Sequence, residues 1–405
     1  MNYKETLNYI HSCGRFSHKA SLERITAVCE KAGNPQNNFK CIHIAGTNGK
    51  GSTCTFVTSA LIAAGYKVGT FVSPFITDFC ERIQINGKYI SPDDLCRLSQ
   101  RVIDMGVALT EFEFITAVGF LYFSENRIDV AVLETGLGGR FDATNVIPQP
   151  LLSVITKIGL DHTSVLGDTL AQIAEEKCGI IKGDNVVTSH NQPSNALSVI
   201  KNYATNLIIP DTNNLKDVEC SILGNSFVYK DVCYETSLGG DYQIENSLIA
   251  IETLKNCGLP ISETDMQTGL KNAFIPARLE MVSRDPLIVI DGAHNPDGAG
   301  ALATALKDYS DCTAIIGVMK DKNYSEVLAK TLPFCKNVIC VTPEGSRSLM
   351  AWELANEAQK YCNNIFTANT LDDAVTLAKE KANEKPIFIF GSLYLASEIR
   401  SLLKD

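Results

Sequence analysis

The densest group of residues that could do chemistry lies in the run His43-Ile44-Ala45-Gly46-Thr47-Asn48-Gly49-Lys50-Gly51-Ser52-Thr53. An apolar segment precedes the glycines and an amphipathic segment follows them, which predicts a strand, a turn and a helix start. Glycines let backbone N–H groups converge on an anion, the helix dipole favours negative charge, and Lys50 adds a positive charge. We therefore expect residues 47–53 to bind the β- and γ-phosphates of a nucleotide. The alternative is a turn that only connects the strand to the helix.

This run departs from the usual phosphate-binding loop, G-x-x-x-x-G-K-[ST]. Gly51 stands where that pattern has its magnesium-binding hydroxyl, and Ser52 and Thr53 follow it. The departure narrows the family of nucleotide-binding proteins to which the loop can belong.

Two further segments place polar residues after apolar runs. Glu134 ends one such run and precedes the glycine-rich stretch 135–145, and Asp161-His162 follow another. Ligands in open α/β sheets bind beyond the carboxyl ends of the strands, so these side chains are expected to hold a magnesium ion opposite the phosphate loop. The alternatives are a solvated acid and a structural histidine.

The remaining candidates are less specific when taken alone. Lys177 stands near the end of a predicted helix, where a solvated lysine is the ordinary interpretation. Asp291-Gly292-Ala293-His294-Asn295-Pro296 follow an apolar run, with proline in the first turn of the next helix. This turn either faces a ligand or uses Asp291 and Asn295 only as helix caps.

The elements that must position these residues alternate between strands and helices, which predicts a mostly parallel sheet with helices on both faces. The expected strands are 41–45, 68–72, 129–134, 152–158 and 186–189, and the expected helices are 50–64, 92–104, 113–124 and 168–177. A hairpin signal at Gly224-Asn225 predicts a small antiparallel sheet over 221–235.

Helices over 242–257 and 263–273 should lead to Pro276, which ends the preceding helix. A second α/β series is then expected, with strands at 287–290, 314–319, 337–341 and 386–390. We place the domain boundary near Pro276.

Composition limits the class of protein. A chain of 405 residues with 45% hydrophobic and 20% charged residues predicts a globular protein of two domains. The net charge of −10 argues against a general nucleic-acid binder. With no signal peptide and no apolar run of about 20 residues, we expect a cytoplasmic protein without a membrane partner. The 14 cysteines include no C-x-x-C pair and are expected to be free, mostly buried thiols.

Together these segments resemble the folylpolyglutamate synthase/dihydrofolate synthase family, within the Mur-ligase group. The resemblance runs from Gly46 nearly to the end of the chain, and the motifs that carry it are Gly46 through Ser52, Ser73-Pro74, Phe112 through Thr116, Glu134 through Asn145, Asp161-His162, Glu176-Lys177, Pro276 through Glu280, Asp291 through Pro296 and Gly391-Ser392-Leu393-Tyr394. The loop ending Gly-Lys-Gly-Ser separates this family from Mur ligases proper.

The resemblance implies a fold, namely an N-terminal P-loop-type, mostly parallel sheet domain with a small antiparallel sheet, and a smaller Rossmann-like α/β C-terminal domain. The implied boundaries are 1–275 for the ATP-binding domain, 276–284 for a linker and 285–405 for the glutamate-ligase domain. The chain is expected to be a monomer.

The resemblance also implies site residues. The loop Gly46, Thr47, Asn48, Gly49, Lys50, Gly51, Ser52 and Thr53 would bind ATP together with Asn246, Arg278 and Asp291. Two magnesium ions are implied, with ligands Ser73, Glu134 and His162, and Lys177 would carry a carbamate. The catalytic groups would be Lys50, Lys177, Asp291 and His294, and the substrate site would include Phe112, Glu113, Thr116, Asp142 and Ser392.

The implied reaction is ATP-dependent addition of L-glutamate to dihydropteroate, to the γ-carboxyl of tetrahydrofolates, or to both, through an acyl phosphate. Closure of the domains about the linker is expected to exclude water from that intermediate. Phe141 replaces a leucine common in the family and lies near the expected pterin site, so substrate preference is open.

Two other functions remain possible on the residues. The first is a Mur-type ligase acting on a cell-wall precursor, which would be expected to carry an added N-terminal domain, whereas only about forty residues precede the loop. The second is a non-catalytic nucleotide-binding switch, which would need the phosphate loop but no second domain of ligand-facing turns.

Overall fold

The computed structural model describes residues 1–14, 21–345 and 347–404. It divides into two compact units, the first comprising Met1–Lys216, Val228–Tyr234 and Glu245–Ala273, and the second Asp217–Phe227, Glu235–Ile244 and Phe274–Asp405. The last and longest segment of the second unit begins at Phe274, and two shorter segments of that unit lie within the range 1–275 expected for the first domain. The segment expected as linker contains a strand, β12 (Glu280–Arg284).

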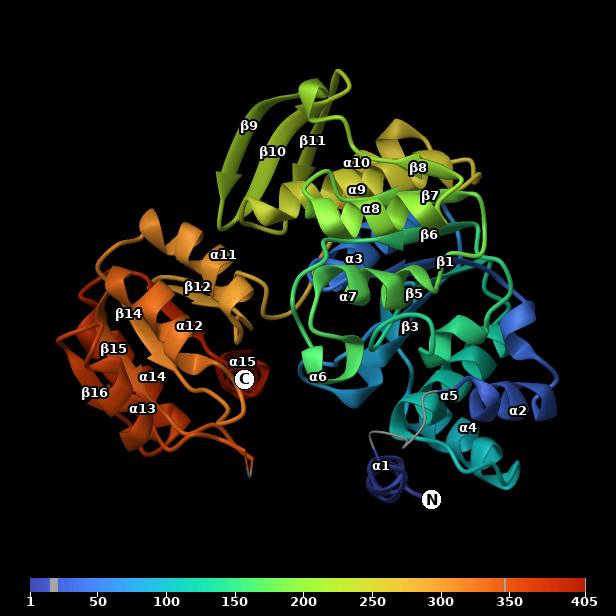
Figure 1. The fold of residues 1–405 in the computed structure, drawn as a ribbon. Helices are drawn as coiled ribbons and strands as arrows, with labels where there is room; N and C mark the ends of the chain where they lie inside the picture. Colours follow the sequence, from blue (N-terminus) through green and yellow to red (C-terminus); the bar gives the residue numbers. More distant parts are fainter. Residues whose placement is uncertain (15–20, 346, 405) are drawn as a thin grey trace. The chain divides into compact units, whose positions relative to one another are not determined.

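An eight-stranded sheet forms the centre of the first unit, in the order β4-β3-β2-β5-β1-β6-β7-β8 (Figure 1). Its strands are β1 (Lys40–Ala45), β2 (Val68–Phe71), β3 (Ile83–Ile85), β4 (Lys88–Tyr89), β5 (Val130–Glu134), β6 (Leu152–Ile155), β7 (Asn185–Thr188) and β8 (Asn206–Ile208). The six neighbouring strands β2, β5, β1, β6, β7 and β8 pair in parallel. β3 and β4 add an antiparallel edge beside β2. The mostly parallel sheet is therefore confirmed.

Helices cover both faces of this sheet. They are α1 (Tyr3–Ser12), α2 (Glu23–Lys31), α3 (Lys50–Ala63), α4 (Pro92–Asp104), α5 (Glu111–Glu125), α6 (Thr163–Leu166), α7 (Leu170–Cys178), α8 (Ser194–Tyr203), α9 (Tyr242–Asn256) and α10 (Glu263–Asn272). Ile42 and Ile44 point to one face of β1 and Cys41 and Ala45 to the other, and all four are buried. Burial on both faces explains why β1 reads as an apolar run with His43 as its one polar residue after Lys40.

Two elements differ from expectation in a way that matters for the site. β6 ends at Ile155 rather than at residue 158, because the next residues turn and the Lys157 carbonyl accepts hydrogen bonds from the phosphate loop. α5 begins at Glu111 rather than at residue 113, because Thr110 and Glu113 form a capping box there.

A three-stranded antiparallel sheet contains β9 (Leu215–Ser221), β10 (Gly224–Tyr229) and β11 (Val232–Thr236). The small sheet is confirmed, but the hairpin signal was misplaced by two residues. The turn is Ile222-Leu223, and Asn225 is a strand residue whose Nδ2 donates to the carbonyls of Leu238 and Gly240.

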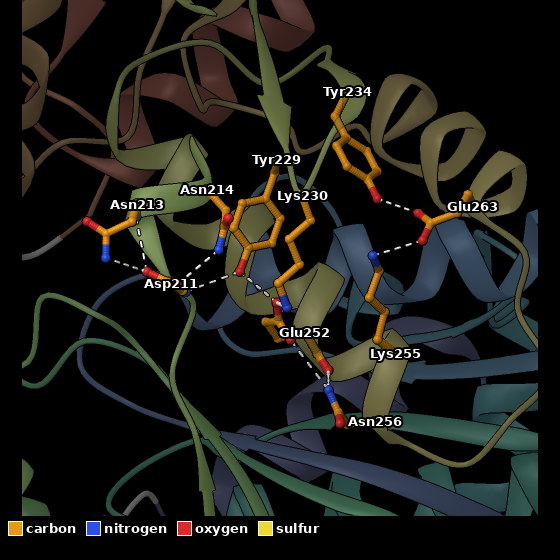
Figure 2. A network of polar contacts seen from close by, with 10 residues as sticks. All are labelled: Asp211, Asn213, Asn214, Tyr229, Lys230, Tyr234, Glu252, Lys255, Asn256 and Glu263. Atoms are coloured by element: carbon orange, nitrogen blue, oxygen red, sulfur yellow. Dashed lines mark hydrogen bonds and ion pairs between the residues drawn. The ribbon is translucent and has the colours of Figure 1, made fainter. Parts of the chain in front are cut away.

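Polar contacts connect this small sheet to α9 and α10 (Figure 2). Glu252 on α9 accepts from Tyr229 Oη and Lys230 Nζ, both at 2.6 Å, and Glu263 on α10 accepts from Tyr234 Oη at 2.6 Å. Lys255 pairs with the other oxygen of Glu263 at 2.8 Å. Of these charged groups Glu252 is buried, and a buried charge needs partners, so its contacts hold the end of β10 on α9.

A six-stranded sheet forms the second unit, in the order β12-β13-β17-β14-β15-β16, with only β12 antiparallel to its neighbour. The other strands are β13 (Leu287–Ile290), β14 (Cys312–Ile316), β15 (Cys335–Cys340), β16 (Ile365–Thr367) and β17 (Ile387–Phe390). The helices are α11 (Pro296–Lys307), α12 (Tyr324–Thr331), α13 (Ala351–Ala358), α14 (Leu371–Ala382) and α15 (Leu393–Lys404). This arrangement confirms a second, smaller α/β unit.

Two sequence expectations concern the chain as a whole. All 14 cysteines are free thiols, and most are buried, with Cys220 and Cys233 exposed. Among the helices of the described residues, none combines the length and the hydropathy that crossing a bilayer requires.

Candidate functional site

The phosphate loop joins β1 to α3 and is fastened to the segment after β6. The backbone N–H groups of Thr47 and Asn48 donate to the Lys157 carbonyl at 3.0 and 3.2 Å, and Thr47 Oγ1 donates to the Gly159 carbonyl at 3.1 Å. Lys50 Nζ donates to the Gly46 carbonyl at 3.1 Å, so the ammonium folds back over the loop. The first N–H groups of α3 have no acceptor within their own helix, which suits an anion at this point.

Two glycines in the loop are required by close approach. Gly49 has φ = 87°, and a Cβ there would overlap Asn246 Oδ1 on α9. A Cβ at Gly46 would overlap Thr156 Oγ1. The structure therefore places Asn246, the residue expected to contact adenine, directly against the loop, and it buries the side chains of Ser52 and Thr53 in α3.

Ser73 and Glu134 meet at the carboxyl edge of the large sheet. Glu134, which is 5% exposed, ends β5, and its Oε2 accepts from the Ser73 backbone N–H at 3.2 Å. A Cβ on Gly51 would lie 3.7 Å from the same oxygen, so the carboxylate faces the start of α3. A carboxylate and a hydroxyl beside a phosphate loop are the hard oxygen donors that magnesium prefers.

His162 is the third expected metal ligand. It precedes α6 with φ = 50°, its side chain is 53% exposed, and its Nε2 lies 3.8 Å from Asp161 Oδ2. The described residues hold no group of three or more His, Cys, Asp or Glu side chains arranged to bind a metal ion. The structure thus brings together Ser73 and Glu134, and the ligand role of His162 stays a prediction.

Lys177 is buried in the last turn of α7 and its Nζ donates to the Gly46 carbonyl at 2.7 Å. Burial, together with the nearby charge of Lys50, lowers the pKa of Lys177 to about 7. A solvated lysine was the ordinary interpretation of this position, and the structure excludes it.

Asp142 is buried, and its carboxylate is occupied by backbone and hydroxyl donors. Its Oδ2 accepts from the N–H groups of Gly136 and Leu137 at 2.8 and 2.9 Å, and its Oδ1 accepts from Thr144 N at 3.0 Å and Thr144 Oγ1 at 2.5 Å. Burial raises the pKa of this carboxyl despite these donors. Asp142 therefore shapes the glycine-rich loop, and direct contact with a substrate stays a prediction.

The other expected substrate residues of this unit lie on the first turns of α5. Glu113 accepts from Arg24 Nε at 3.0 Å and Arg24 Nη2 at 2.8 Å, and Thr116 Oγ1 donates to the Phe112 carbonyl at 2.7 Å. The Phe112 ring lies against Gly136, where a Cβ would come within 2.5 Å of it. Glu113 and Thr116 thus use their polar groups within the protein, whereas Phe112 faces the glycine-rich loop.

In the second unit, Asp291 connects two turns. Its Oδ2 accepts from Leu279 N at 2.9 Å and its Oδ1 from Ala293 N at 2.8 Å. Burial raises the pKa of Asp291, and the charge of Arg278 lowers it. Ala277 and Leu279 have φ values of 51° and 45°, which non-glycine residues seldom adopt, so this segment is held in place by its contacts.

His294 and Ser392 follow β13 and β17, which are neighbours in the sheet. His294 Nδ1 lies 2.8 Å from the Gly292 carbonyl, which fixes the direction of the ring. Ser392 is 1% exposed, and its Oγ accepts from Leu395 N at 3.0 Å, so its hydroxyl caps α15. Roles of these two residues toward glutamate stay predictions.

Arg82 contacts the site, although no sequence motif selected it. Its Nη1 donates to Ser73 Oγ at 3.2 Å, and its guanidinium lies 5.2 and 5.3 Å from the ring centres of Phe75 and Phe79. A single arginine does not form a recognisable sequence motif, so its contacts become visible only in the folded structure.

Two family models match the chain: the Mur ligase middle domain over residues 44–254, and the Mur ligase glutamate ligase domain over residues 277–393. The chain is 39% identical to the folylpolyglutamate synthase of Lacticaseibacillus casei, in an alignment that covers 100% of this chain and 99% of the relative. It is 37% identical to the dihydrofolate synthase/folylpolyglutamate synthase of Bacillus subtilis, with 99% of each chain covered.

A solved structure supports the same relationship. The fold is similar to that of Escherichia coli FolC in complex with DHPP and ADP, with a TM-score of 0.88 and 27% identity. That comparison covers 100% of this chain and 98% of the other.

Proposed function

Because this chain belongs to the folylpolyglutamate synthase/dihydrofolate synthase family of Mur ligases, we propose that it is an ATP-dependent ligase that adds L-glutamate to dihydropteroate, to the γ-carboxyl of folates, or to both. The observation that carries the proposal is the loop between β1 and α3, which lies against Asn246 on one side and faces the Glu134 carboxylate on the other. That arrangement suits a nucleoside triphosphate whose terminal phosphate is to be transferred.

The chemistry follows from what a carboxylate can do. A carboxylate is a poor electrophile, so one of its oxygens first attacks the γ-phosphorus of ATP, which gives an acyl phosphate and ADP. The amine of L-glutamate then attacks the acyl carbon, and phosphate leaves with the former carboxylate oxygen. Lys50, placed over the loop, offsets the charge that spreads over the phosphoryl oxygens during transfer.

The residues at the carboxyl edge of the large sheet fit magnesium. Ser73, Glu134 and His162 would hold the metal, and two ions are proposed. When bound, magnesium supplies positive charge that neutralises the phosphate oxygens.

Lys177 fits a carbamate. The neutral Nζ amine adds to carbon dioxide, and the N–C bond forms as one proton is released. A pKa of about 7 leaves much of this amine neutral near pH 7, which an ordinary lysine would not be. The product is a carboxylate-like group beside the phosphate loop, where a cation would otherwise stand.

In the second part of the chain, Arg278 and Asp291 are proposed to contact the nucleotide, and His294 and Ser392 the glutamate. The same proposal assigns residues 1–275 to ATP binding, 276–284 to a linker and 285–405 to the glutamate-ligase domain. Two expectations, a monomer and a cytoplasmic location, stay predictions.

The proposal is tested by measuring ADP release in the presence of ATP, magnesium and L-glutamate with either dihydropteroate or tetrahydrofolate. We expect glutamate-dependent ADP release with at least one acceptor, and its loss in Lys50→Ala. The acceptor that works assigns the activity. No glutamate-dependent ADP release with either acceptor would refute the proposal.

A further inference from the structure

Three buried polar side chains join β1 to the glycine-rich loop after β5. His43 Nε2 on β1 lies 2.8 Å from Thr144 Oγ1, and Thr144 Oγ1 donates to Asp142 Oδ1 at 2.5 Å. His43 and Thr144 are fully buried, and Asp142 is 5% exposed. His43 and Thr144 have no part in the reaction proposed above.

The proton positions in this chain follow from the number of donors. A threonine hydroxyl has one proton, and Thr144 gives it to Asp142, so its oxygen must accept a proton from His43 Nε2. His43 is therefore neutral with its proton on Nε2. Its Nδ1 is buried and has no hydrogen-bond partner among the described residues, which suits a lone pair rather than a second N–H.

Asp142 connects the hydrogen bonds of His43 and Thr144 to the glycine-rich loop. Its two oxygens accept from the N–H groups of Gly136 and Leu137 and from both donors of Thr144. Without the Thr144 hydroxyl, Oδ1 would lose one of its two donors, and only backbone N–H groups would hold the carboxylate. The carboxylate could then shift, and the hydrogen bonds from the Gly136 and Leu137 N–H groups would weaken.

The rest of the loop has little room to absorb such a movement. The Arg140 N–H donates to the Glu176 carbonyl at 2.8 Å, and a Cβ on Gly139 would lie 2.7 Å from the Lys177 carbonyl. At its other end, Gly136 lies against the Phe112 ring. A shift at Asp142 would therefore change the surface that Phe112 and the loop present together.

We infer that His43 and Thr144 are positioning residues that act through Asp142 to hold the loop 136–141 in the shape that binds the pterin-bearing substrate. This inference rests on the proposed function, because that function supplies the substrate. Loss of either side chain should weaken binding of the pterin substrate. It should leave ATP binding unaffected, because ATP is proposed to bind at the end of β1 and not at this loop.

The principal test is Thr144→Val, which keeps the side-chain shape and removes the hydroxyl. We expect the KM for dihydropteroate or tetrahydrofolate to rise about tenfold, the effect of one buried hydrogen bond, with the KM for ATP nearly unchanged. Thr144→Ser keeps a hydroxyl and should restore the wild-type KM. His43→Leu should act in the same direction, and the double variant should be no worse than the worse single variant, because both break one chain.

The matched control is Thr331→Val in α12. Thr331 is also fully buried, and its hydroxyl donates to the Val327 carbonyl at 2.8 Å. This control should lower Tm and leave every KM as in the wild type. If Thr144→Val behaves like this control, the hydrogen bonds between His43, Thr144 and Asp142 are merely structural and the inference is wrong.

Amide hydrogen exchange gives a second readout that does not depend on the activity. The amides of Gly136 and Leu137 should exchange faster in Thr144→Val, and unchanged exchange would overturn the inference even if the enzyme is active. A wild-type protein without glutamate-dependent ADP release would instead refute the proposed function. If His43→Leu does not fold, His43→Gln tests the same contact, because its amide can donate in place of Nε2, and it should show a near-normal KM.

Discussion

Lys177 combines burial, a lowered pKa and a hydrogen bond to the phosphate loop. We predict that Lys177→Ala lowers kcat more than about 100-fold, because the proposed carbamate beside the phosphate loop cannot form. A short carboxylic acid added to the assay should restore part of the rate. The measurement is kcat with and without that acid.

Lys182 provides a matched control, because it is also a lysine whose pKa is lowered by burial. Its Nζ donates to the carbonyls of Asn145 and Ile147 at 2.6 and 2.7 Å. Lys182→Ala should lower stability, and a carboxylic acid should not rescue it. Full activity of Lys177→Ala would contradict the carbamate.

Gly49 tests the phosphate loop at a single position. Gly49 and Gly65 have nearly the same φ, 87° and 86°, but only at Gly49 would a Cβ meet another residue, Asn246. Both changes to alanine should cost about 1–2 kcal/mol of stability from the backbone alone. Only Gly49→Ala should also weaken ATP binding, measured by calorimetry. Equal ATP affinity in the two variants would show that the close approach to Asn246 has no effect on the nucleotide.

His43 should give the protein a measurable pH dependence. Burial lowers the pKa of His43 from 6.5 to about 3, so the unfolded chain binds a proton in a range where the folded chain does not. Above pH 6.5, His43 is neutral in both states and does not make stability depend on pH. As the pH falls from 6.5 toward 3, proton binding by the unfolded chain lowers the free energy of unfolding by about 1.4 kcal/mol per pH unit. Urea unfolding of the wild type and His43→Leu should therefore show an advantage of the wild type at pH 7 that shrinks by pH 5. A constant difference would contradict a neutral, buried His43.

Sequence patterns located residues well but not their partners. The glycine-rich run correctly predicted a turn that begins a helix at Lys50, because glycine and helix-start signals are local. The substrate role of Asp142 stays a prediction, and its carboxylate also accepts from Gly136, Leu137 and Thr144. Which donors reach a carboxylate depends on how the loop folds over β1, and no local pattern records that.

At the scale of elements, Glu252 is the main anchor of the small antiparallel sheet to α9 (Figure 2). Glu252 is 3% exposed, so Glu252→Ala would leave Tyr229 and Lys230 without their buried acceptor. We predict that the free energy of unfolding falls by about 3 kcal/mol, measured by urea denaturation.

The exposed pair of Lys216 and Asp231 on the same sheet is the control, since the two side chains are 60% and 89% exposed. Lys216→Ala should change the free energy of unfolding by less than about 0.5 kcal/mol. If both variants had the same small effect, the Glu252 contacts would not anchor the sheet.

Four of the strands that sequence analysis missed share a cause, whereas β3, which it also missed, is paired on both sides. β4, β8, β12 and β16 are the edge strands of their sheets. An edge strand is short and partly solvated, so it lacks the apolar run by which β1, β5 and β17 were predicted. The order of the strands could not be predicted from sequence patterns either, because it depends on pairing between segments that are distant in the sequence.

At the scale of the whole molecule, the alternation of strands and helices predicted two α/β units, and each unit has its own sheet. The residues expected to act on ATP lie mainly after β1, β2, β5 and β6, at one edge of one sheet, because parallel strands end together. Asp291, His294 and Ser392 likewise follow neighbouring strands of the second sheet.

The central claim, ligation through an acyl phosphate, is tested most directly by following the carboxylate oxygens. The acceptor, dihydropteroate or tetrahydrofolate, is labelled with ¹⁸O in the carboxylate and incubated with the protein, ATP, magnesium and L-glutamate, and the released phosphate is analysed by mass spectrometry. The account predicts one ¹⁸O atom in phosphate for each amide bond formed. Amide formation with unlabelled phosphate, or no amide with either acceptor, would contradict it.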